Sequence, residues 1–221
     1  MAPFEVIASH PDFVVAHKPA GVSFHSEQES GFVALLAEQL GEQLYPVHRL
    51  DKVTSGLLVL ARSSHAAARL TELFTSRAVD KFYLALIDSK PKKKQGWVKG
   101  DMARSRRGTY KLLTSQDKPA ITRFYSASIA PGLRACLLKP YSGKTHQLRV
   151  ALKSLSAPIL GDVSYGGSEA DRVYLHAYCL SFEWDNERMT FYALPQSGAR
   201  FVELADTEVM QSWAKPRELE W

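Results

Sequence analysis

The sequence lacks the features of several protein classes. No apolar run approaches the roughly 20 residues that a membrane-spanning helix needs, and residues 1–6 lack the basic-then-apolar pattern of a signal peptide. Only two cysteines occur, Cys136 and Cys179, and both have apolar neighbours, so we expect buried thiols and a cytoplasmic protein. The seven histidines show no HExxH or comparable spacing, and the cysteines form no CxxC pair. We therefore expect no metal site.

The composition is that of an ordinary globular protein, with 45% hydrophobic and 23% charged residues among 221. Runs of β-branched, aromatic and aliphatic residues predict strands at 13–16, 56–61, 81–87, 121–128, 133–139, 173–184 and 189–194. Helical spacing of apolar residues predicts helices at 31–40, 65–76, 145–155 and 207–213. Because the strands outnumber the helices and do not alternate strictly with them, we expect an α+β fold. Its expected form is a single domain, residues 1–221, with a large mixed, mainly antiparallel sheet, a few flanking helices and a catalytic cleft on the sheet.

Positive charge is concentrated in residues 90–111, which we call the basic segment. It holds nine Lys and Arg against one acid, Asp101, a net charge of +8 in a chain whose formal net charge is +5. Such a concentration suits a polyanionic partner, because each cation placed beside a phosphate releases condensed counterions. A solvated loop that is basic for solubility alone is an equally good interpretation. Pro91 and Gly96 indicate a loop or hairpin inserted between strands.

The most distinctive local pattern is HRLDKVTSGLLVLA at residues 48–61. It begins with charged residues, continues with small polar residues and ends in an apolar stretch typical of a buried strand. A carboxylate on such a loop, here Asp51, is held rigidly yet remains reachable from a cleft. Taken alone, an exposed loop with an Arg49–Asp51 ion pair is the simpler interpretation. A hydrolase triad of Ser55, His48 and Asp51 is disfavoured, because triads usually join distant segments and no GxSxG elbow occurs.

The same pattern closely resembles the HRLDxxTSGLLVLA signature of the RluA-type pseudouridine synthases. Further blocks resemble the family in its order: KPAGVSFH at 18–25, KFYLAL at 81–86, SGKTHQLRV at 142–150, APILGD at 157–162, YG at 165–166 and LHA at 175–177. The resemblance covers residues 18 to about 182. It implies an enzyme that isomerises uridine to pseudouridine in structured RNA, either transfer or ribosomal RNA. Because the first block begins at residue 18, we expect no separate N-terminal RNA-binding domain.

Three catalytic residues follow from this resemblance. It makes Asp51 the catalytic carboxylate, pairs it with Arg149, and makes Tyr83 the ring that stacks on the target base and accepts a proton late in the reaction. Without the resemblance, Tyr83 would be a core aromatic and Arg149 a surface residue of a helix. A carboxylate in a dry pocket needs a nearby cation to stay ionised, which suits the expected pair. The reaction involves no redox change, group transfer or energy input, so we expect no cofactor.

Substrate contacts also follow from the resemblance. A uridine in a stem must leave the stack before it reacts, and Arg49 matches the family residue that enters the vacated space. His48 orients the loop or is only structural. Lys144 contacts substrate where the family usually has Arg, and it lacks the bidentate guanidinium; Ala151 replaces a frequent His. We expect the basic segment to grip the RNA backbone, through Lys92, Lys93, Lys94, Arg104, Arg106 and Arg107.

Two other functions fit parts of the sequence. One is a catalytically inactive RNA-binding protein on the same scaffold, against which the intact Asp51, Tyr83 and Arg149 argue. The other is a sheet-based module that binds acidic proteins or membranes, which would leave the polar motifs without a purpose. We therefore expect a monomeric enzyme that acts on structured RNA and has no membrane partner. The motifs do not encode which uridine is modified, because RNA shape and loop contacts determine specificity.

Overall fold

The computed structural model describes residues 3–25 and 30–221 of the chain. These residues fall into two compact units. Unit 1 consists of Met1–Lys81 and Ala177–Pro195, and unit 2 consists of Phe82–His176 and Gln196–Trp221. Within the described ranges, no helix has both the length and the apolar character that a membrane crossing requires.

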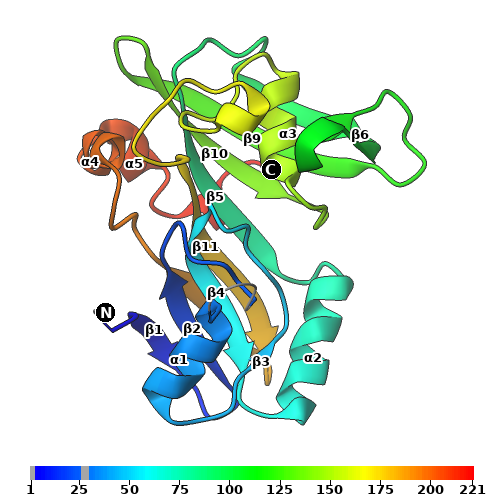
Figure 1. Cartoon of the computed structure of the whole chain (residues 1–221), viewed down its shortest axis with the longest axis vertical. Helices are drawn as coiled ribbons and strands as arrows, with labels where there is room; N and C mark the ends of the chain where they lie inside the picture. The colour runs from blue at the N-terminus through cyan, green and yellow to red at the C-terminus, as the bar shows by residue number, and fades with distance from the viewer. Residues whose placement is uncertain (1–2, 26–29) are drawn as a thin grey trace. The chain divides into compact units, whose positions relative to one another are not determined.

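Unit 1 is built on a buried antiparallel pair of strands. The strands of unit 1 are hydrogen-bonded in the order β1 (Val6–Ser9), β2 (Phe13–Lys18), β4 (Ser55–Ala61) and β11 (Leu175–Trp184). In addition, β12 (Glu187–Tyr192) pairs with β11, and β3 (Tyr45–Pro46) pairs with β4. Every residue of β2 and β4 is buried, which explains why residues 13–16 and 57–61 are uniformly apolar. Two helices flank these strands, α1 (Phe32–Leu40) and α2 (Ser64–Thr75). Figure 1 shows α2 alongside β3, and α2 also packs on β4.

The start of α2 follows from a single capping residue. Ser63 has extended backbone geometry, and its Oγ accepts the N–H of Ala66 (3.1 Å), which satisfies one of the free donors of the first turn. Ala66 and Leu70 then face the core of unit 1, which also contains Phe13, Val15, Leu57, Val59, Leu180, Phe182 and Trp184.

Unit 2 has four antiparallel strands in the order β5 (Asp80–Ile87), β10 (Leu133–Pro140), β9 (Ala120–Ala130) and β6 (Gln95–Gly100). A separate hairpin follows β6, formed by β7 (Met102–Arg104), η1 (Arg106–Gly108) and β8 (Tyr110–Leu112). The helical elements are α3 (Gln147–Ser154), η2 (Val163–Tyr165), α4 (Ala199–Ala205), α5 (Glu208–Ser212) and η3 (Pro216–Glu218). Of these, α3 packs on β9, β10 and β8.

Strand register assigns side chains to the two faces of the unit 2 sheet. Leu138 lies opposite both Tyr83 and Phe124, so these three side chains share a face. Gln147 of α3 donates to Oγ1 of Thr122, two residues before Phe124 on the same strand. Tyr83 therefore points to the face on which α3 packs, and the odd-numbered residues of β9 point to the opposite face.

The predicted fold class is confirmed. The chain is α+β, with ten of its described strands in one large, mainly antiparallel sheet and few helices. The predicted strands and helices all occur with small shifts in their ends. The helix expected at 145–155 begins only at Gln147, because His146 adopts a left-handed backbone conformation (φ 57°). That residues 1–221 form a single domain stays a prediction.

Two expectations about particular segments have different outcomes. The loop or hairpin expected at 90–111 is correct for the β7–β8 hairpin, but it is wrong for residues 95–100, which form β6 of the large sheet. Both cysteines are free and buried, as expected. Burial raises the pKa of the Cys136 thiol to about 12, so this thiol stays protonated.

Candidate active site

Asp51 lies on a short turn between β3 and β4. The N–H of Thr54 donates to the carbonyl of Asp51 (3.0 Å) and closes the turn, after which the buried strand β4 begins at Ser55. Asp51 is half-buried, and Arg49 is exposed. The sequence expectation of a carboxylate directly before a buried strand is therefore met. We call residues 48–54 the Asp51 loop.

A buried lysine, Lys18, is hydrogen-bonded to the Asp51 loop. Lys18, at the end of β2, is 0% exposed, and its Nζ donates to the carbonyls of Pro19 (2.9 Å), Val22 (2.8 Å) and Lys52 (3.3 Å). An ammonium group carries three N–H donors and can therefore serve several carbonyls at once. The Lys52 carbonyl also accepts the N–H of Gly21 (2.8 Å), whose positive φ of 86° suits glycine. The KPAG segment thus fixes the backbone immediately after Asp51.

His48 fastens the other end of the Asp51 loop. Its Nε2 accepts the N–H of Val59 in β4 (2.9 Å), and its ring stacks on Phe74 of α2 at 4.2 Å between centroids. Burial, assisted by the positive charge of Lys81, lowers the pKa of His48 from 6.5 to about 3. The imidazole is therefore neutral at neutral pH, so it orients the loop and brings no positive charge to an RNA ligand.

The glycine of the TSGLLVLA sequence has a steric explanation. Gly56 has φ 114°, and a Cβ built there would overlap the backbone of Ala177 in β11. Any larger residue would push β4 away from β11, immediately after the turn that carries Asp51.

In unit 2, a buried glutamine fastens the start of α3 to β9. Gln147 is 6% exposed, and its Oε1 accepts from the Oγ of Ser142 (2.8 Å) and the N–H of Lys144 (3.0 Å). Its Nε2 donates to the carbonyl of Ile121 and to Oγ1 of Thr122, both at 3.0 Å. With its polar atoms satisfied, this side chain holds the SGKTHQLRV motif on the sheet.

Arg149 forms a buried bidentate ion pair with Asp162. Its Nε lies 2.7 Å from Oδ2 and its Nη2 lies 2.8 Å from Oδ1, and the two side chains are 7% and 1% exposed. Such parallel hydrogen bonds fix the plane of the guanidinium, which also lies 4.7 Å from the ring centroid of Tyr165. A cation in the first turn of a helix is disfavoured by the helix dipole, and Asp162 compensates it here.

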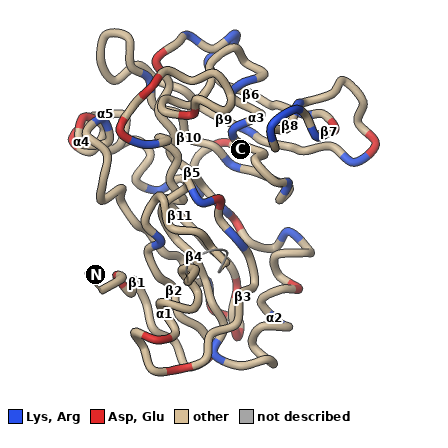
Figure 2. Tube along the Cα trace, in the orientation of Figure 1, with Lys and Arg blue, Asp and Glu red and all other residues tan. Residues whose placement is uncertain are grey.

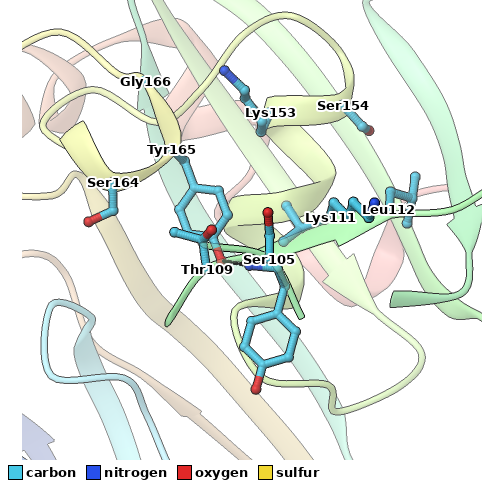
Figure 3. Close-up of a pocket in the computed structure, with 11 residues that line it drawn as sticks. Ser105, Thr109, Lys111, Leu112, Lys153, Ser154, Ser164, Tyr165 and Gly166 are labelled. Atoms are coloured by element: carbon cyan, nitrogen blue, oxygen red, sulfur yellow. Dashed lines mark hydrogen bonds between the residues drawn. The ribbon is translucent and has the colours of Figure 1, made fainter. Parts of the chain in front are cut away.

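Tyr165 links this ion pair to a neighbouring cleft. Its hydroxyl lies 2.8 Å from Nδ1 of His146 and accepts the N–H of Tyr110 (3.0 Å). Figure 3 shows the Tyr165 ring among the side chains that line a cleft of about 480 Å³ between α3, η2 and the β7–β8 hairpin. The lining includes hydroxyl groups and two lysines, from Ser105, Thr109, Ser154, Ser164, Lys111 and Lys153. This chemistry suits a polar, anionic ligand.

The remaining predicted site residues lie in unit 2. Tyr83 is half-buried on the α3 face of the sheet, and Lys144 is exposed just before α3. The predicted RNA-gripping residues are all exposed: Lys92, Lys93, Lys94, Arg104, Arg106 and Arg107. Figure 2 shows Lys and Arg recurring along β6 to β8. The structure thus places Arg149 and Tyr83 on one face of unit 2 and gathers His48, Arg49 and Asp51 in unit 1. The Asp51–Arg149 contact stays a prediction.

Three residues of the site were not expected from the sequence. Lys18, Asp162 and Tyr165 all lie in blocks that resemble the family, but the sequence alone gave none of them a role. The signal for Asp162 was the need of a buried arginine for a carboxylate close by. The signal for Lys18 was its position at the end of β2, a strand in which His17 is the one other polar residue.

Comparisons with known proteins support one family. The model of a family described as RNA pseudouridylate synthase matches residues 12–154. An uncharacterized RNA pseudouridine synthase of Haemophilus influenzae is 47% identical over 98% of this chain and 93% of its own length. A tRNA pseudouridine synthase C of Vibrio parahaemolyticus is 31% identical over 91% of this chain and 87% of its own length. A ribosomal large subunit pseudouridine synthase C of Rickettsia bellii is 32% identical over 78% of this chain and 61% of its own length.

A solved structure agrees with these relatives. The human RNA pseudouridylate synthase domain containing 1 protein has a TM-score of 0.74 and 26% identity, over 86% of this chain and 82% of that chain. The two chains share their fold over that length, so fold and sequence point to the same family.

Proposed function

The chain belongs to the RNA pseudouridine synthase family and is an isomerase that acts on RNA, and from this premise we propose that Asp51 is its catalytic carboxylate. One observation carries the proposal: Asp51 sits half-buried on a turn that Lys18 and Thr54 fix through the backbone. A carboxylate held in this way can approach a bound nucleotide without losing orientation.

Besides the carboxylate, the reaction requires a site that holds the uracil and a group that accepts a proton. The glycosidic carbon–nitrogen bond of uridine breaks, the uracil turns, and a carbon–carbon bond from carbon 5 to the same sugar forms. The proton on carbon 5 is released to a base, and N1 of the uracil takes up a proton. We propose that Tyr83 stacks on the uracil and that its hydroxyl takes part in this proton transfer. We also propose that Arg149, whose guanidinium plane is fixed by Asp162, lies beside the Asp51 carboxylate and offers it a positive charge.

The RNA substrate is a transfer or ribosomal RNA. Relatives named for each kind match this chain at similar identity, 31% and 32%. We propose that the exposed guanidinium of Arg49 fills the space left by the extruded uridine. The exposed cations of the basic segment and the lysines of the Tyr165 cleft would contact phosphates around the target.

The test uses RNA labelled with tritium at carbon 5 of uridine. Transcripts of transfer RNAs and of ribosomal RNA are incubated separately with the protein, and released tritium reports pseudouridine formation. We expect release from one kind of RNA and none with Asp51→Asn, a loss of at least about 1,000-fold, or roughly 4 kcal/mol of barrier. Turnover of Asp51→Asn within tenfold of the parent would remove Asp51 from this role.

Tyr83→Phe provides a second, milder test. The ring that packs is kept and the hydroxyl is lost, so single-turnover rate should fall far more than RNA affinity. Equal rates for the two proteins would leave Tyr83 as a packing residue. Tight RNA binding by the parent without tritium release from any transcript would favour the inactive RNA-binding protein.

A further inference from the structure

The face of the unit 2 sheet opposite Tyr83 carries an ordered set of cations and rings. We call it the cation–aromatic face, and it consists of Trp97, Lys99, Arg123, Tyr125, Lys139 and Tyr141. Register explains the arrangement, because Arg123 of β9 lies opposite Trp97 of β6 on one side and Lys139 of β10 on the other. These three side chains therefore form one row across three strands.

Cations and rings alternate closely on this face. The guanidinium of Arg123 lies 5.2 Å from the Trp97 ring and 6.0 Å from the Tyr125 ring. The ammonium of Lys99 lies 4.8 Å from Trp97, and that of Lys139 lies 5.2 Å from Tyr141. Trp97 and Tyr141 are themselves in contact, with centroids 5.1 Å apart. Each of these six residues keeps part of its surface accessible, and Lys99 is exposed.

The charge on the face has one sign. The residues of β6, β9 and β10 include no Asp or Glu, so the strands that form the face contribute cations and no acidic residues of their own. On the opposite side of the same strands, the side chains of Val98, Thr122, Phe124 and Leu138 are buried. The face is therefore a surface built on a rigid support.

Trp221 forms one border of the face. Its ring lies 5.1 Å from that of Tyr125 and 5.3 Å from that of Phe82, and the Tyr125 hydroxyl donates to the carbonyl of Glu220. Packing of residues 216–221 explains Phe82, part of Tyr125 and part of Lys139, whose ammonium lies 5.7 Å from the Trp221 ring. It does not explain Trp97 and Tyr141, whose rings contact each other and lie beneath Lys99, Arg123 and Lys139.

We propose that the cation–aromatic face is a second RNA-binding surface, which takes unpaired nucleotides by stacking bases on Trp97 and Tyr141 and pairing phosphates with Lys99, Arg123 and Lys139. Aromatic rings accept any base, and interleaved cations follow the backbone, a combination typical of single-strand binding. Part of the face belongs to the basic segment, because Trp97 and Lys99 lie on β6, which joins Lys92, Lys93 and Lys94 to the β7–β8 hairpin. The inference rests on the proposed function in that the ligand is the same RNA, bound away from its target uridine.

The test measures binding of a fluorescent oligouridylate of about twelve nucleotides, which has no stable secondary structure, to the full chain. Arg123→Gln with Lys139→Gln should lower affinity about tenfold and flatten the plot of log affinity against log salt by about 1.4, or about 0.7 per lost phosphate contact. Trp97→Leu should weaken binding about tenfold with little change in salt slope. Parent-like affinity and slope in both variants would overturn the proposal and leave the face as packing.

A matched control removes the same charge elsewhere. Arg69, in unit 1, also lies over an indole, at 3.9 Å from the Trp184 ring, and Arg188 is paired with Glu183. The double variant Arg69→Gln with Arg188→Gln should keep parent-like binding. If the face variants melt early, the parent can be cross-linked to an oligonucleotide carrying 4-thiouridine. Adducts on Trp97 or Tyr141 support the proposal, and adducts confined to other peptides overturn it.

The two proposals fail in different ways. Failure of the proposed function appears as absence of tritium release by the parent, whatever the oligouridylate affinity. Failure of this inference appears as unchanged oligouridylate binding by face variants of an enzyme that still releases tritium. At saturating RNA, single-turnover release should be the same for the parent and for Trp97→Leu.

Discussion

In unit 1, the candidate catalytic residue Asp51 is positioned by neighbouring residues. In unit 2, the candidate catalytic residue Arg149 is itself part of the buried structure. The Asp51 loop is fastened by Lys18 and His48, through backbone carbonyls and an uncharged ring. Arg149, in contrast, is itself half of a buried ion pair with Asp162. The comparison teaches that chemistry and stability can be separated by mutation in unit 1 but are joined at Arg149.

The largest expected effect on stability is therefore in unit 2. Arg149→Met leaves the Asp162 carboxylate buried without its partner, and we expect a loss of roughly 3–5 kcal/mol in the free energy of unfolding, measured with urea. Arg149→Met combined with Asp162→Leu should recover part of that loss, because no charge is then stranded.

A more exposed pair provides the control. Arg62 and Glu42 are 3.0 Å apart with side chains 23% and 32% exposed, and Arg62→Met should lower stability by about 1 kcal/mol or less. Asp51→Asn should leave stability nearly unchanged, since Asp162 still pairs with Arg149. Comparable losses for Arg149→Met and Arg62→Met would break the contrast between the two units.

The next effect is expected at Lys18. Lys18→Met removes the donors to three backbone carbonyls around a fully buried ammonium site, so we expect a loss of about 2 kcal/mol in unfolding free energy. Because the Lys52 carbonyl lies next to Asp51, the turnover number should fall more than RNA affinity. Lys52→Met, which changes an exposed side chain and keeps that carbonyl, should be stable. Parent-like turnover in a folded Lys18→Met protein would show that the Asp51 loop needs no such support.

An effect that is absent at neutral pH and grows as the solution is acidified is expected at His48. The pKa of His48 is about 3 in the folded protein and 6.5 in the unfolded chain, so below pH 6.5 the unfolded state binds the extra proton. The contribution of His48 is thus complete above pH 6.5 and declines as the pH falls toward 3, by up to about 1.4 kcal/mol per pH unit. His48→Gln should flatten unfolding free energy against pH in this window. His65→Gln, an exposed change on α2, should leave the parent curve unaltered.

The smallest effect on stability, and a clear effect on binding, is expected in the basic segment. Changing Lys92, Lys93 and Lys94 together to Gln alters exposed side chains and should shift the melting temperature by no more than about 2 °C. RNA affinity at low salt should fall, and the salt slope should flatten by up to about two to three units. Cognate and unrelated RNAs should respond alike, since phosphate contacts carry no sequence information. An unchanged slope would mean that these lysines only face solvent.

Local patterns predicted the elements that are periodic or uniformly apolar, and they missed those that depend on the rest of the fold. β4 and α2 were predictable because each carries its own apolar signal. β6 was missed because QGWVKG has two glycines and a lysine, and it becomes a strand only by pairing with β9. The resemblance supplied Asp51, Tyr83 and Arg149 as candidates. The Arg149–Asp162 pair required the path of the chain through η2, which no spacing rule encodes.

The buried thiols have a practical consequence. Cys136 and Cys179 are both buried, and Cys136 stays protonated because its pKa is about 12, so neither offers an accessible thiolate to maleimide dyes. A cysteine introduced at an exposed position could then be labelled selectively in the otherwise unaltered chain. One dye placed on α2 and another on the β7–β8 hairpin would give an energy-transfer signal between the two units. That signal would follow, in real time, how the enzyme responds when an RNA arrives and when it leaves.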